Sequence, residues 1–467
     1  MESKYKKLGM NAMIFAIGTF SQKILSFLFV PFYTAVLTTS DYGTADLVLT
    51  VCSMLWPLLT LMIDEGVLRF CLDNDIEKEH IVSIGMYFNI FGFFILLIFS
   101  PVILFVEALK ANYILFILYY FAYTVANFFS YTLRGLGEIK KFTVSGIINT
   151  ILTITLNLFF LLELQLGIRG YLLSFIIAYI GTGIFQFFSV KLYRYIILPK
   201  KLDRFYCKKM LNYSVPLIPN SISWWISNSS DRLIVTAVCG VAANGIYSVA
   251  YKIPSLITVC SGIFSNAWQI SAIDGYGTES NRKFFSNIYL KYSSCSTILV
   301  SVIVFVNKYI CRFLFSKGFY EAWRFAPILV FAVSFQIISG FLGTIYTTAK
   351  NTKMIFISTI VAASANIILN LYLIPLWGET GAAIATCFSY FLIWSIRIVD
   401  SRKIMILDVE WKTEVVVNIL ILIEVVVSCS EYYFELPVNL IIVVFIVLLR
   451  RNFLKSIWSL ITVKIKA

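Results

Sequence analysis

Long runs of apolar residues, separated by short polar breaks, follow one another along almost the whole chain. A helix needs about 20 mostly apolar residues to cross the hydrocarbon core of a bilayer, and it satisfies its own backbone polar groups there. The runs lack the strict alternation of barrel strands. The pattern predicts an all-α polytopic membrane protein with about 14 transmembrane helices. We place them at 9–37, 43–70, 81–107, 112–134, 142–164, 170–196, 211–238, 245–272, 286–315, 323–348, 354–376, 381–399, 413–430 and 436–449.

The composition excludes an ordinary soluble protein. Of the 467 residues, 59% are hydrophobic and 13% are charged, whereas soluble domains have about 45–50% and about 25%. No connection is long enough to fold as an aqueous catalytic domain, so we expect no enzyme and no catalytic residues. The nine cysteines form no C-x-x-C pair, and the single histidine, His80, cannot build a usual zinc site. We therefore assign neither a metal nor another cofactor.

The distribution of charge orients the predicted helices. A net charge of +13 would suggest a nucleic acid partner in a soluble protein, but here the cations must first be placed relative to the membrane. Assigning the connections alternately to two sides puts 28 Lys and Arg residues on one side and six on the other. Both termini are therefore expected in the cytoplasm and the Ser430–Glu435 turn outside. The basic start is interpreted as leading into a retained first span, and no nucleic acid partner is expected.

The connection between the sixth and seventh predicted spans is longer and more basic than the others. It carries seven cations within 191–209, beside apolar residues such as Leu202 and Tyr206 at helical spacing. This combination is typical of a helix that lies on the anionic inner leaflet, and it predicts a basic cytoplasmic amphipathic linker at 199–209. The tail at 450–466 has a similar pattern. Membrane anchoring is the favoured interpretation of both segments, and partner binding is the alternative.

An internal repeat divides the chain. At an offset of 213 residues, Ser145 matches Ser358 and Asn157 matches Asn370. After a deletion of two residues, further matches join Gly167 to Gly378, Gly170 to Gly381 and Tyr179 to Tyr390. A second match, at an offset of 202, joins Thr34-Ala35-Val36 to Thr236-Ala237-Val238 and Gly43 to Gly245. Chance similarity between apolar helices is the alternative interpretation.

The repeat predicts two pseudo-symmetric six-helix lobes. Because six is even, the two lobes have the same orientation, and an axis along the membrane normal would relate them. We assign 1–198 to the N-terminal lobe and 210–403 to the C-terminal lobe. Residues 404–467 then form two extra transmembrane helices and a basic cytoplasmic tail.

Five groups of residues form a pattern over residues 1–400. They are Asn11, Gly18, Pro31-Phe32-Tyr33 and Ser40-Asp41-Tyr42-Gly43; Asp64-Glu65-Gly66 with Arg69-Phe70; Ser230-Asp231-Arg232; Gly245-Ile246-Tyr247-Ser248-Val249-Ala250-Tyr251-Lys252; and Gly378-Glu379-Thr380-Gly381-Ala382-Ala383. The pattern resembles that of Wzx-type polysaccharide flippases, which belong to the multidrug/oligosaccharidyl-lipid/polysaccharide (MOP) exporter superfamily.

This resemblance implies an alternating-access flippase in a cell inner (cytoplasmic) membrane. The implied substrate is an undecaprenyl-diphosphate-linked oligosaccharide, which moves from the inner to the outer leaflet for surface polysaccharide biosynthesis. The product would be an O-antigen of lipopolysaccharide, a capsule or an exopolysaccharide. The implied partners are this lipid-linked substrate, membrane lipids, an H⁺ or Na⁺ coupling ion, and the polysaccharide polymerase and chain-length machinery.

Cations inside predicted spans are the first candidates for binding the lipid diphosphate. A Lys at the centre of a span costs about 2.5–3.5 kcal/mol on insertion scales, so it seldom occurs without a partner or an aqueous cavity. Lys23 lies deepest, and Arg232 and Lys252 share a depth near the outer ends of their spans. Snorkelling or an internal ion pair is the alternative for Lys23, and an outer gate built with Asp231 is the alternative for Arg232 and Lys252.

Acidic residues within or near the spans are candidates for a gate or for ion coupling. Glu65, Arg69 and Asp73 have i, i+4 spacing, which is typical of a helix-end ion-pair ladder and, alternatively, of a cytoplasmic gate. Five acids are candidates for coupling transport to an ion: Asp46, Asp64, Asp231, Glu163 and Glu424. Asp46 and Glu163 lie near the outer interface, where a satisfied surface acid is the favoured interpretation.

Three other functions are compatible with many spans. A multidrug antiporter of the same superfamily would share the two-lobe plan, although twelve spans would suffice. A lipid II flippase, also with fourteen spans, is closest in mechanism. A polysaccharide polymerase usually has a large outer loop with catalytic arginines or histidines, whereas the outer connections here are short.

Overall fold

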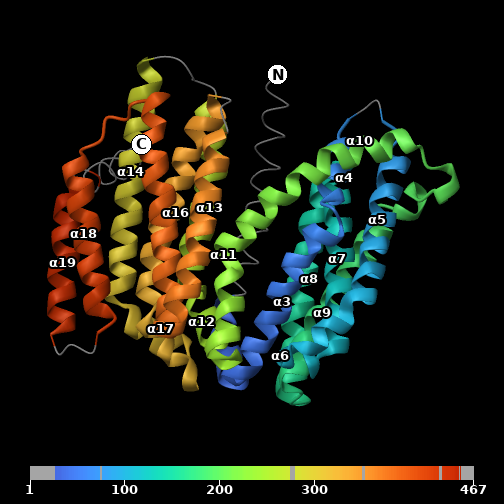
Figure 1. Ribbon diagram of the computed structural model, residues 1–467, viewed down its shortest axis with the longest axis horizontal. Coiled ribbons are helices and arrows are strands. Elements are labelled where there is room, and N and C mark those ends of the chain that lie inside the picture. The colour runs from blue at the N-terminus through green and yellow to red at the C-terminus, as the bar shows by residue number, and fades with distance from the viewer. Residues whose placement is uncertain are drawn as a thin grey trace, which may run out of the picture. The chain divides into compact units, whose positions relative to one another are not determined.

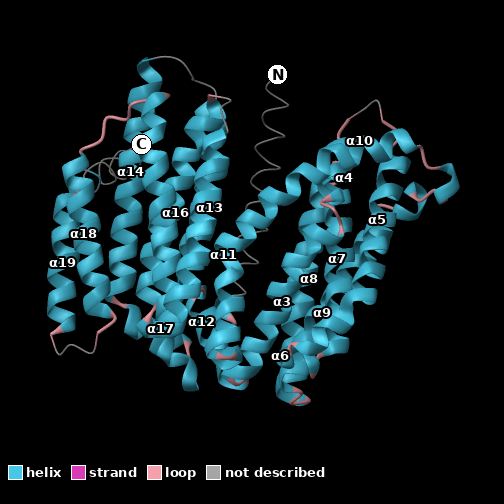
Figure 2. Cartoon of the chain, in the orientation of Figure 1, coloured by secondary structure: helices cyan, strands magenta, loops and turns pink. Residues whose placement is uncertain are grey.

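The computed structural model describes residues 27–73, 76–273, 279–349, 353–430, 434–451 and 453. These residues form helices joined by short turns, and no strand occurs among them (Figures 1 and 2). The predicted all-α class is confirmed. The chain divides at Trp225 and Ile226 into two compact units, and this division falls inside one long helix, α11 (Ile218–Cys239). The predicted lobe limits at 198 and 210 stay predictions.

The first unit contains the helices up to the beginning of α11. They are α2 (Val30–Val36), α3 (Thr39–Leu59), α4 (Ile63–Cys71), α5 (Lys78–Phe99), α6 (Glu107–Lys110), α7 (Tyr113–Gly135), α8 (Ile139–Leu158), α9 (Gly167–Ser189) and α10 (Arg204–Ser214). Short 3-10 or π segments follow α5, α8, α9 and α10.

The second unit contains the rest of α11 and the helices that follow it. They are α12 (Val241–Ala250), α13 (Lys252–Ile273), α14 (Glu279–Phe305), α15 (Asn307–Leu314), α16 (Ala326–Thr348), α17 (Lys353–Asp400), α18 (Trp411–Ser428) and α19 (Glu435–Leu449). Among the described residues of both units, eight helices are long and apolar enough to cross a membrane, and 241–250 and 435–449 are shorter apolar helices. The chain is thus a multi-pass membrane protein.

The predicted span at 43–70 is two helices rather than one. Pro57 lies near the end of α3, and Leu61 and Met62 then adopt φ values of 53° and 54°. This left-handed conformation costs about 1–2 kcal/mol for a residue with a Cβ, so the surrounding packing must hold it. The break places Asp64 in the first turn of α4.

α17 is a helical hairpin that turns at Gly378, where φ is 57° and ψ is −136°. Arg397 Nε donates a hydrogen bond of 3.0 Å to Ser358 Oγ, although 39 residues separate the two. Along an unbroken helix that separation would be about 58 Å. The two predicted spans 354–376 and 381–399 are therefore the two limbs of this hairpin.

Local geometry in the two units agrees with the internal repeat. Gly167 has φ of 54° and its repeat partner Gly378 has φ of 57°. The repeat alignment pairs Gln186 with Arg397, and Gln186 Nε2 donates a hydrogen bond of 3.0 Å to Ser145, just as Arg397 donates to Ser358. Such agreement in backbone and side chains favours the repeat over chance similarity between apolar helices.

The amphipathic linker packs against the first unit. Met210 of α10 is fully buried in a core cluster with residues of α4 and α5, and Leu202 and Tyr206 pack against the same cluster. Phe205 is 65% exposed. Part of the apolar face is therefore occupied by protein, and its role as an anchor on the inner leaflet stays a prediction.

Candidate functional site

Asp64 is a fully buried carboxylate of the first unit. Asn89 Nδ2 of α5 donates a hydrogen bond of 2.8 Å to Asp64 Oδ1, and Trp56 Nε1 of α3 donates one of 3.0 Å to Asp64 Oδ2. The N-terminal turn of α4 also favours a negative charge. The carboxylate thus joins α3, α4 and α5 without a cationic partner in either hydrogen bond.

The remaining acidic and basic residues of α4 have separate partners. Glu65 accepts a hydrogen bond of 3.1 Å from the Tyr131 hydroxyl of α7, and Arg134 lies 4.2 Å from the centre of the Tyr131 ring. Arg69 forms a solvent-exposed ion pair of 2.6 Å with Asp73. The structure therefore forms the Arg69–Asp73 part of the predicted ladder, while Glu65 contacts α7.

Asp231 is the centre of a polar cluster in the second unit and is 2% exposed. Its Oδ2 accepts hydrogen bonds from the hydroxyls of Tyr247 at 2.7 Å and Tyr251 at 2.9 Å, and Thr386 contributes a longer one of 3.4 Å. Its Oδ1 accepts one of 2.9 Å from the Arg232 backbone. Three neutral hydroxyls thus solvate this carboxylate where water is excluded.

The candidate cations are placed differently. The Arg232 guanidinium is half-buried and lies 5.3 Å from the centre of the Tyr251 ring, so Arg232 and Asp231 share Tyr251 as a neighbour. Lys252 follows Tyr251 directly and begins α13. Lys23 lies outside the described residues. The structure therefore brings Asp231, Arg232 and the start of α13 together, and the role of all three cations stays a prediction.

A row of amides and hydroxyls extends the Asp231 cluster. Tyr390 donates a hydrogen bond of 2.8 Å to Asn228 Oδ1, and Ser230 donates one of 3.3 Å to Asn366 Oδ1. Asn370 Nδ2 donates one of 3.0 Å to the same Asn366 oxygen. Among the described residues, Asn366 Nδ2 and Asn370 Oδ1 have no hydrogen-bond partner although both side chains are buried.

These amide residues were missed as site candidates in the sequence, although one signal was present. Asn370 is the repeat partner of Asn157, which is also fully buried and also has a side-chain oxygen without a hydrogen-bond partner among the described residues. A fully buried amide is costly unless its polar atoms are satisfied. Its recurrence in both halves of an apolar sequence therefore could have marked both positions as site candidates.

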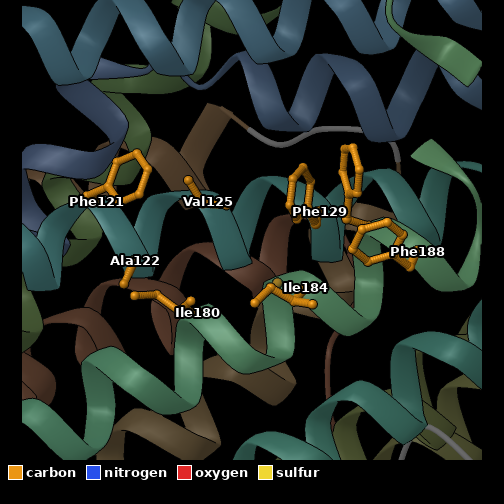
Figure 3. Close-up of a pocket in the computed structure, with 9 residues that line it drawn as sticks. Phe121, Ala122, Val125, Phe129, Ile180, Ile184 and Phe188 are labelled. Carbon is orange, nitrogen blue, oxygen red and sulfur yellow. The ribbon is translucent and has the colours of Figure 1, made fainter. Parts of the chain in front are cut away.

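One well-formed pocket among the described residues is apolar and lies apart from these groups. It has a volume of about 260 Å³ and opens between α7 and α9 (Figure 3). Its lining consists of Phe121, Ala122, Val125, Phe129, Ile180, Gly183, Ile184, Phe187 and Phe188. Gly183 corresponds to Trp394 in the repeat alignment, so the two halves differ here in side-chain volume. The pocket contains none of the predicted site residues.

The described residues contain no group of three or more His, Cys, Asp or Glu side chains that could hold a metal ion. Their buried chemistry consists of carboxylates, amides, hydroxyls and a few cations set among apolar helices. Together with the repeat, this defines a two-unit helical membrane protein with polar groups held inside each unit.

Comparison with known sequences identifies its family. The chain belongs to the polysaccharide biosynthesis protein family, whose sequence model matches residues 8–269. It is also 26% identical over 435 residues to an uncharacterized membrane protein of Methanocaldococcus jannaschii, with 82% of each chain covered. A second uncharacterized membrane protein of that organism is 25% identical over 408 residues, covering 82% of this chain and 95% of that one.

Solved structures show the same fold at low sequence identity. A lipid II flippase MurJ in an inward closed conformation superposes with a TM-score of 0.68 at 14% identity, covering 96% of this chain and all of that chain. A multidrug resistance MATE family transporter of the MOP superfamily, in an inward-facing conformation, gives 0.67 at 15% identity and covers 82% of this chain and 94% of that one. The polysaccharide family match agrees with the resemblance found in the sequence, and these structures show that the chain shares the fold of MurJ and of the MATE transporter.

Proposed function

We propose that this protein is a flippase that moves an undecaprenyl-diphosphate-linked oligosaccharide from the inner to the outer leaflet of the cytoplasmic membrane. The family match over residues 8–269 is the observation that carries the proposal. The lipid II flippase fold at a TM-score of 0.68 supports a lipid-linked substrate. In this proposal both termini are cytoplasmic, and the glycan is the repeat unit of an O-antigen, capsule or exopolysaccharide.

The substrate sets two physical requirements. Its apolar polyprenyl tail can stay in the lipid, whereas its diphosphate and sugars must cross about 30 Å of hydrocarbon. The cost falls when the protein supplies cations for the phosphates and hydrogen-bonding groups for the sugars. We assign the phosphate role to Lys23, Arg232 and Lys252.

Conformational change in this proposal is coupled to an ion at Asp231 or Asp64. Each carboxylate is buried and accepts its hydrogen bonds from neutral donors such as Tyr247 and Asn89. A bound H⁺ or Na⁺ would neutralise it, so ion binding and release would change the cost of rearranging the helices around it. Glu65 and the Arg69–Asp73 pair are the candidates for a cytoplasmic gate.

The same fold supports two alternatives. A multidrug antiporter fits the likeness to the MATE family transporter, and a lipid II flippase fits the likeness to MurJ. The polysaccharide family match favours the oligosaccharide flippase over both. The lipid that accumulates when transport stops distinguishes them.

The test is deletion of the gene followed by mass spectrometry of undecaprenyl-linked lipids. We expect one completed oligosaccharide repeat unit to accumulate on the inner leaflet, and a plasmid copy should clear it. Accumulation of lipid II would favour the lipid II flippase. Unchanged lipids with increased drug sensitivity would favour the antiporter, and either result would contradict the proposal.

A further inference from the structure

The interface between α14, α18 and α19 carries polar side chains at several levels across the membrane. These three helices pack against one another within the second unit (Figure 1). α14 has 27 residues, or about 40 Å of helix, which is enough to cross a bilayer. We call this row the polar seam; its members are Ser293, Ser296, Thr297 and Ser301 of α14, Glu414, Asn418 and Glu424 of α18, Asn439 of α19 and Arg450 after it.

Ion pairs occupy both ends of the polar seam. At one end Arg450 binds Glu414 through two hydrogen bonds of 2.7 and 2.9 Å, and Ser293 donates one of 2.9 Å to the same carboxylate. At the other end Lys308 pairs with Glu435. The charges at each end therefore cancel within a pair.

Glu424 lies between these ion pairs and is fully buried. The Ser301 hydroxyl donates a hydrogen bond of 2.7 Å to Glu424 Oε2, whereas Oε1 has no hydrogen-bond partner among the described residues. Ionised, this carboxylate would hold an unpaired charge among apolar helices, which is expensive.

Asn439 provides a second polar group at the same level. The Glu414–Arg450 ion pair fixes the relative position of the antiparallel helices α18 and α19. Glu424 follows Glu414 by ten residues, and Asn439 precedes Arg450 by eleven. Nearly equal spacing from the same ion pair places Glu424 and Asn439 at a similar depth. Asn439 is fully buried, and neither its Nδ2 nor its Oδ1 has a hydrogen-bond partner among the described residues. Three buried polar atoms without a hydrogen-bond partner among the described residues thus lie on the neighbouring helices α18 and α19.

The seam also encloses a small polar cavity on the side of the Glu414–Arg450 pair. Its volume is about 10 Å³, and its polar lining consists of Ser293, Ser296, Thr297, Ser334, Glu414 and Asn418, with Tyr289 and Trp394 beside them. This is the space that one water molecule needs. Ser296 Oγ has no hydrogen-bond partner among the described residues. A water held there would add a further donor and acceptor to the row of hydroxyls.

We propose that Glu424 is a proton-binding site within the polar seam, separate from Asp64 and Asp231. A metal cation prefers a shell of several oxygen ligands, whereas Ser301 is the only hydrogen-bond partner that Glu424 has among the described residues. A proton needs no shell, and hydroxyls with a single water can relay it. When a proton binds, Glu424 becomes a neutral carboxylic acid, which removes the cost of an unpaired charge among apolar helices.

Other ionisable groups on the helices packed against α18 do not contact Glu424 by any hydrogen bond or ion pair in the described structure. They are Arg282, Lys283, Tyr289, Lys291, Tyr292 and Cys295 of α14, Tyr346 of α16, and Glu435 and Arg450 at the ends of α19. On α18 itself Glu414 is paired with Arg450, and Lys412 and Cys429 lie toward its two ends. Glu424 is therefore the carboxylate in the middle of the polar seam that is available to bind a proton.

The proposal is tested by infrared difference spectroscopy of the purified full-length protein during a pH titration. A buried carboxyl group gives a carbonyl band when protonated, and Asp64 and Asp231 can contribute to the same spectral region. We expect one component of this band to titrate in the wild type and to be absent in Glu424→Gln. Glu410→Gln is the matched control, because Glu410 is exposed at the start of the same helix. Ser301→Ala should shift the midpoint of the titration, because it deletes the hydrogen bond to the carboxylate.

Three outcomes would overturn the assignment. They are identical titrations of the wild type and Glu424→Gln, loss of the band in Glu410→Gln alone, or a band that responds to replacing choline by Na⁺ at constant pH instead of to pH. If Glu424→Gln gives no folded protein, Ser301→Ala decides, since an unchanged midpoint contradicts the proposal. The measurement needs no transport substrate, so its result does not depend on the oligosaccharide assignment.

Discussion

Arg397 and Ser358 are joined by a hydrogen bond of 3.0 Å from Nε to Oγ, and the repeat-related Gln186 and Ser145 are joined by one of the same length. The bond ties the two limbs of the α17 hairpin together, as its counterpart ties α9 to α8. The two halves have therefore kept a helix-to-helix contact while its donor changed from a neutral amide to a guanidinium. Arg397 is 3% exposed, and it also donates to the backbone of Ser339 at 2.9 Å.

Arg397 should stabilise the second unit through these neutral acceptors. Arg397→Ala removes the donor and leaves buried acceptors unsatisfied, at a cost of about 1–3 kcal/mol. Arg397→Gln should recover part of the loss, because glutamine makes the equivalent contact in the first unit. Thermal unfolding in detergent measures both effects, with exposed Lys412→Ala as the control. Equal stability of Arg397→Ala and the wild type would contradict this account.

Gly378 and Gly381 should be intolerant of a side chain for different reasons. Gly378→Ala places a Cβ on left-handed backbone at a cost of about 1–2 kcal/mol. At Gly381 a Cβ would lie 2.3 Å from the Leu373 carbonyl oxygen, so the hairpin must shift and the loss should be larger. Gly340→Ala is the control, because a Cβ there meets nothing within 4 Å. The melting temperatures should fall in the order Gly340→Ala, Gly378→Ala, Gly381→Ala; any other order argues against the turn geometry.

The charge of Lys23 should be what matters for transport. If it compensates the substrate diphosphate, Lys23→Arg keeps glycan export, Lys23→Gln reduces it and Lys23→Glu abolishes it, because like charges would meet at low dielectric. Surface glycan is measured in cells that express equal amounts of each variant in the membrane. Export at the wild-type rate by Lys23→Glu would show that Lys23 does not face the substrate.

Asp231 should be required for the response to a coupling ion. Asp231→Asn keeps the size of the side chain but can neither bind a proton nor provide a charge for Na⁺. We expect transport in proteoliposomes to lose its dependence on an imposed H⁺ or Na⁺ gradient, while Glu379→Gln, a change in the α17 turn, leaves that dependence intact. If transport by Asp231→Asn still depends on the imposed gradient, the coupling ion binds at another residue and this prediction is wrong.

Both termini should lie in the cytoplasm, and the last turn, at Ser430–Glu435, should lie outside. Positive residues are retained in the cytoplasm, so reporter fusions after Ala467 and at Glu431 should give opposite activities, cytoplasmic for the first and external for the second. A pair of reporters that read out the same compartment would contradict the fourteen-span topology.

The sequence by itself determined the helical class and indicated the repeat. The ends of the spans were predicted less well, since 43–70 is divided between α3 and α4, and 245–272 between α12 and α13. A membrane-spanning helix can be recognised without knowing its neighbours. About 20 apolar residues cross the bilayer as a helix that forms all of its backbone hydrogen bonds internally. The glycines of the repeat could be recognised for a similar reason, since a left-handed turn depends on local sterics. Gly167 and Gly378, which the repeat pairs in the sequence, accordingly have φ values of 54° and 57°.

Only the tertiary structure decided which polar groups meet. Spacing suggested that Glu65 belongs to a ladder with Arg69, yet Glu65 accepts from Tyr131, 66 residues away. Likewise, Asp231 accepts hydrogen bonds from Tyr247 and Thr386, which lie on two other helices. Ser301 donates a hydrogen bond to Glu424, which is 123 residues away in the sequence. Such contacts depend on helix rotation and register, which many distant apolar contacts set together. Apolar periodicity in a membrane protein is weak evidence for that rotation, because the lipid-facing and protein-facing sides are both apolar.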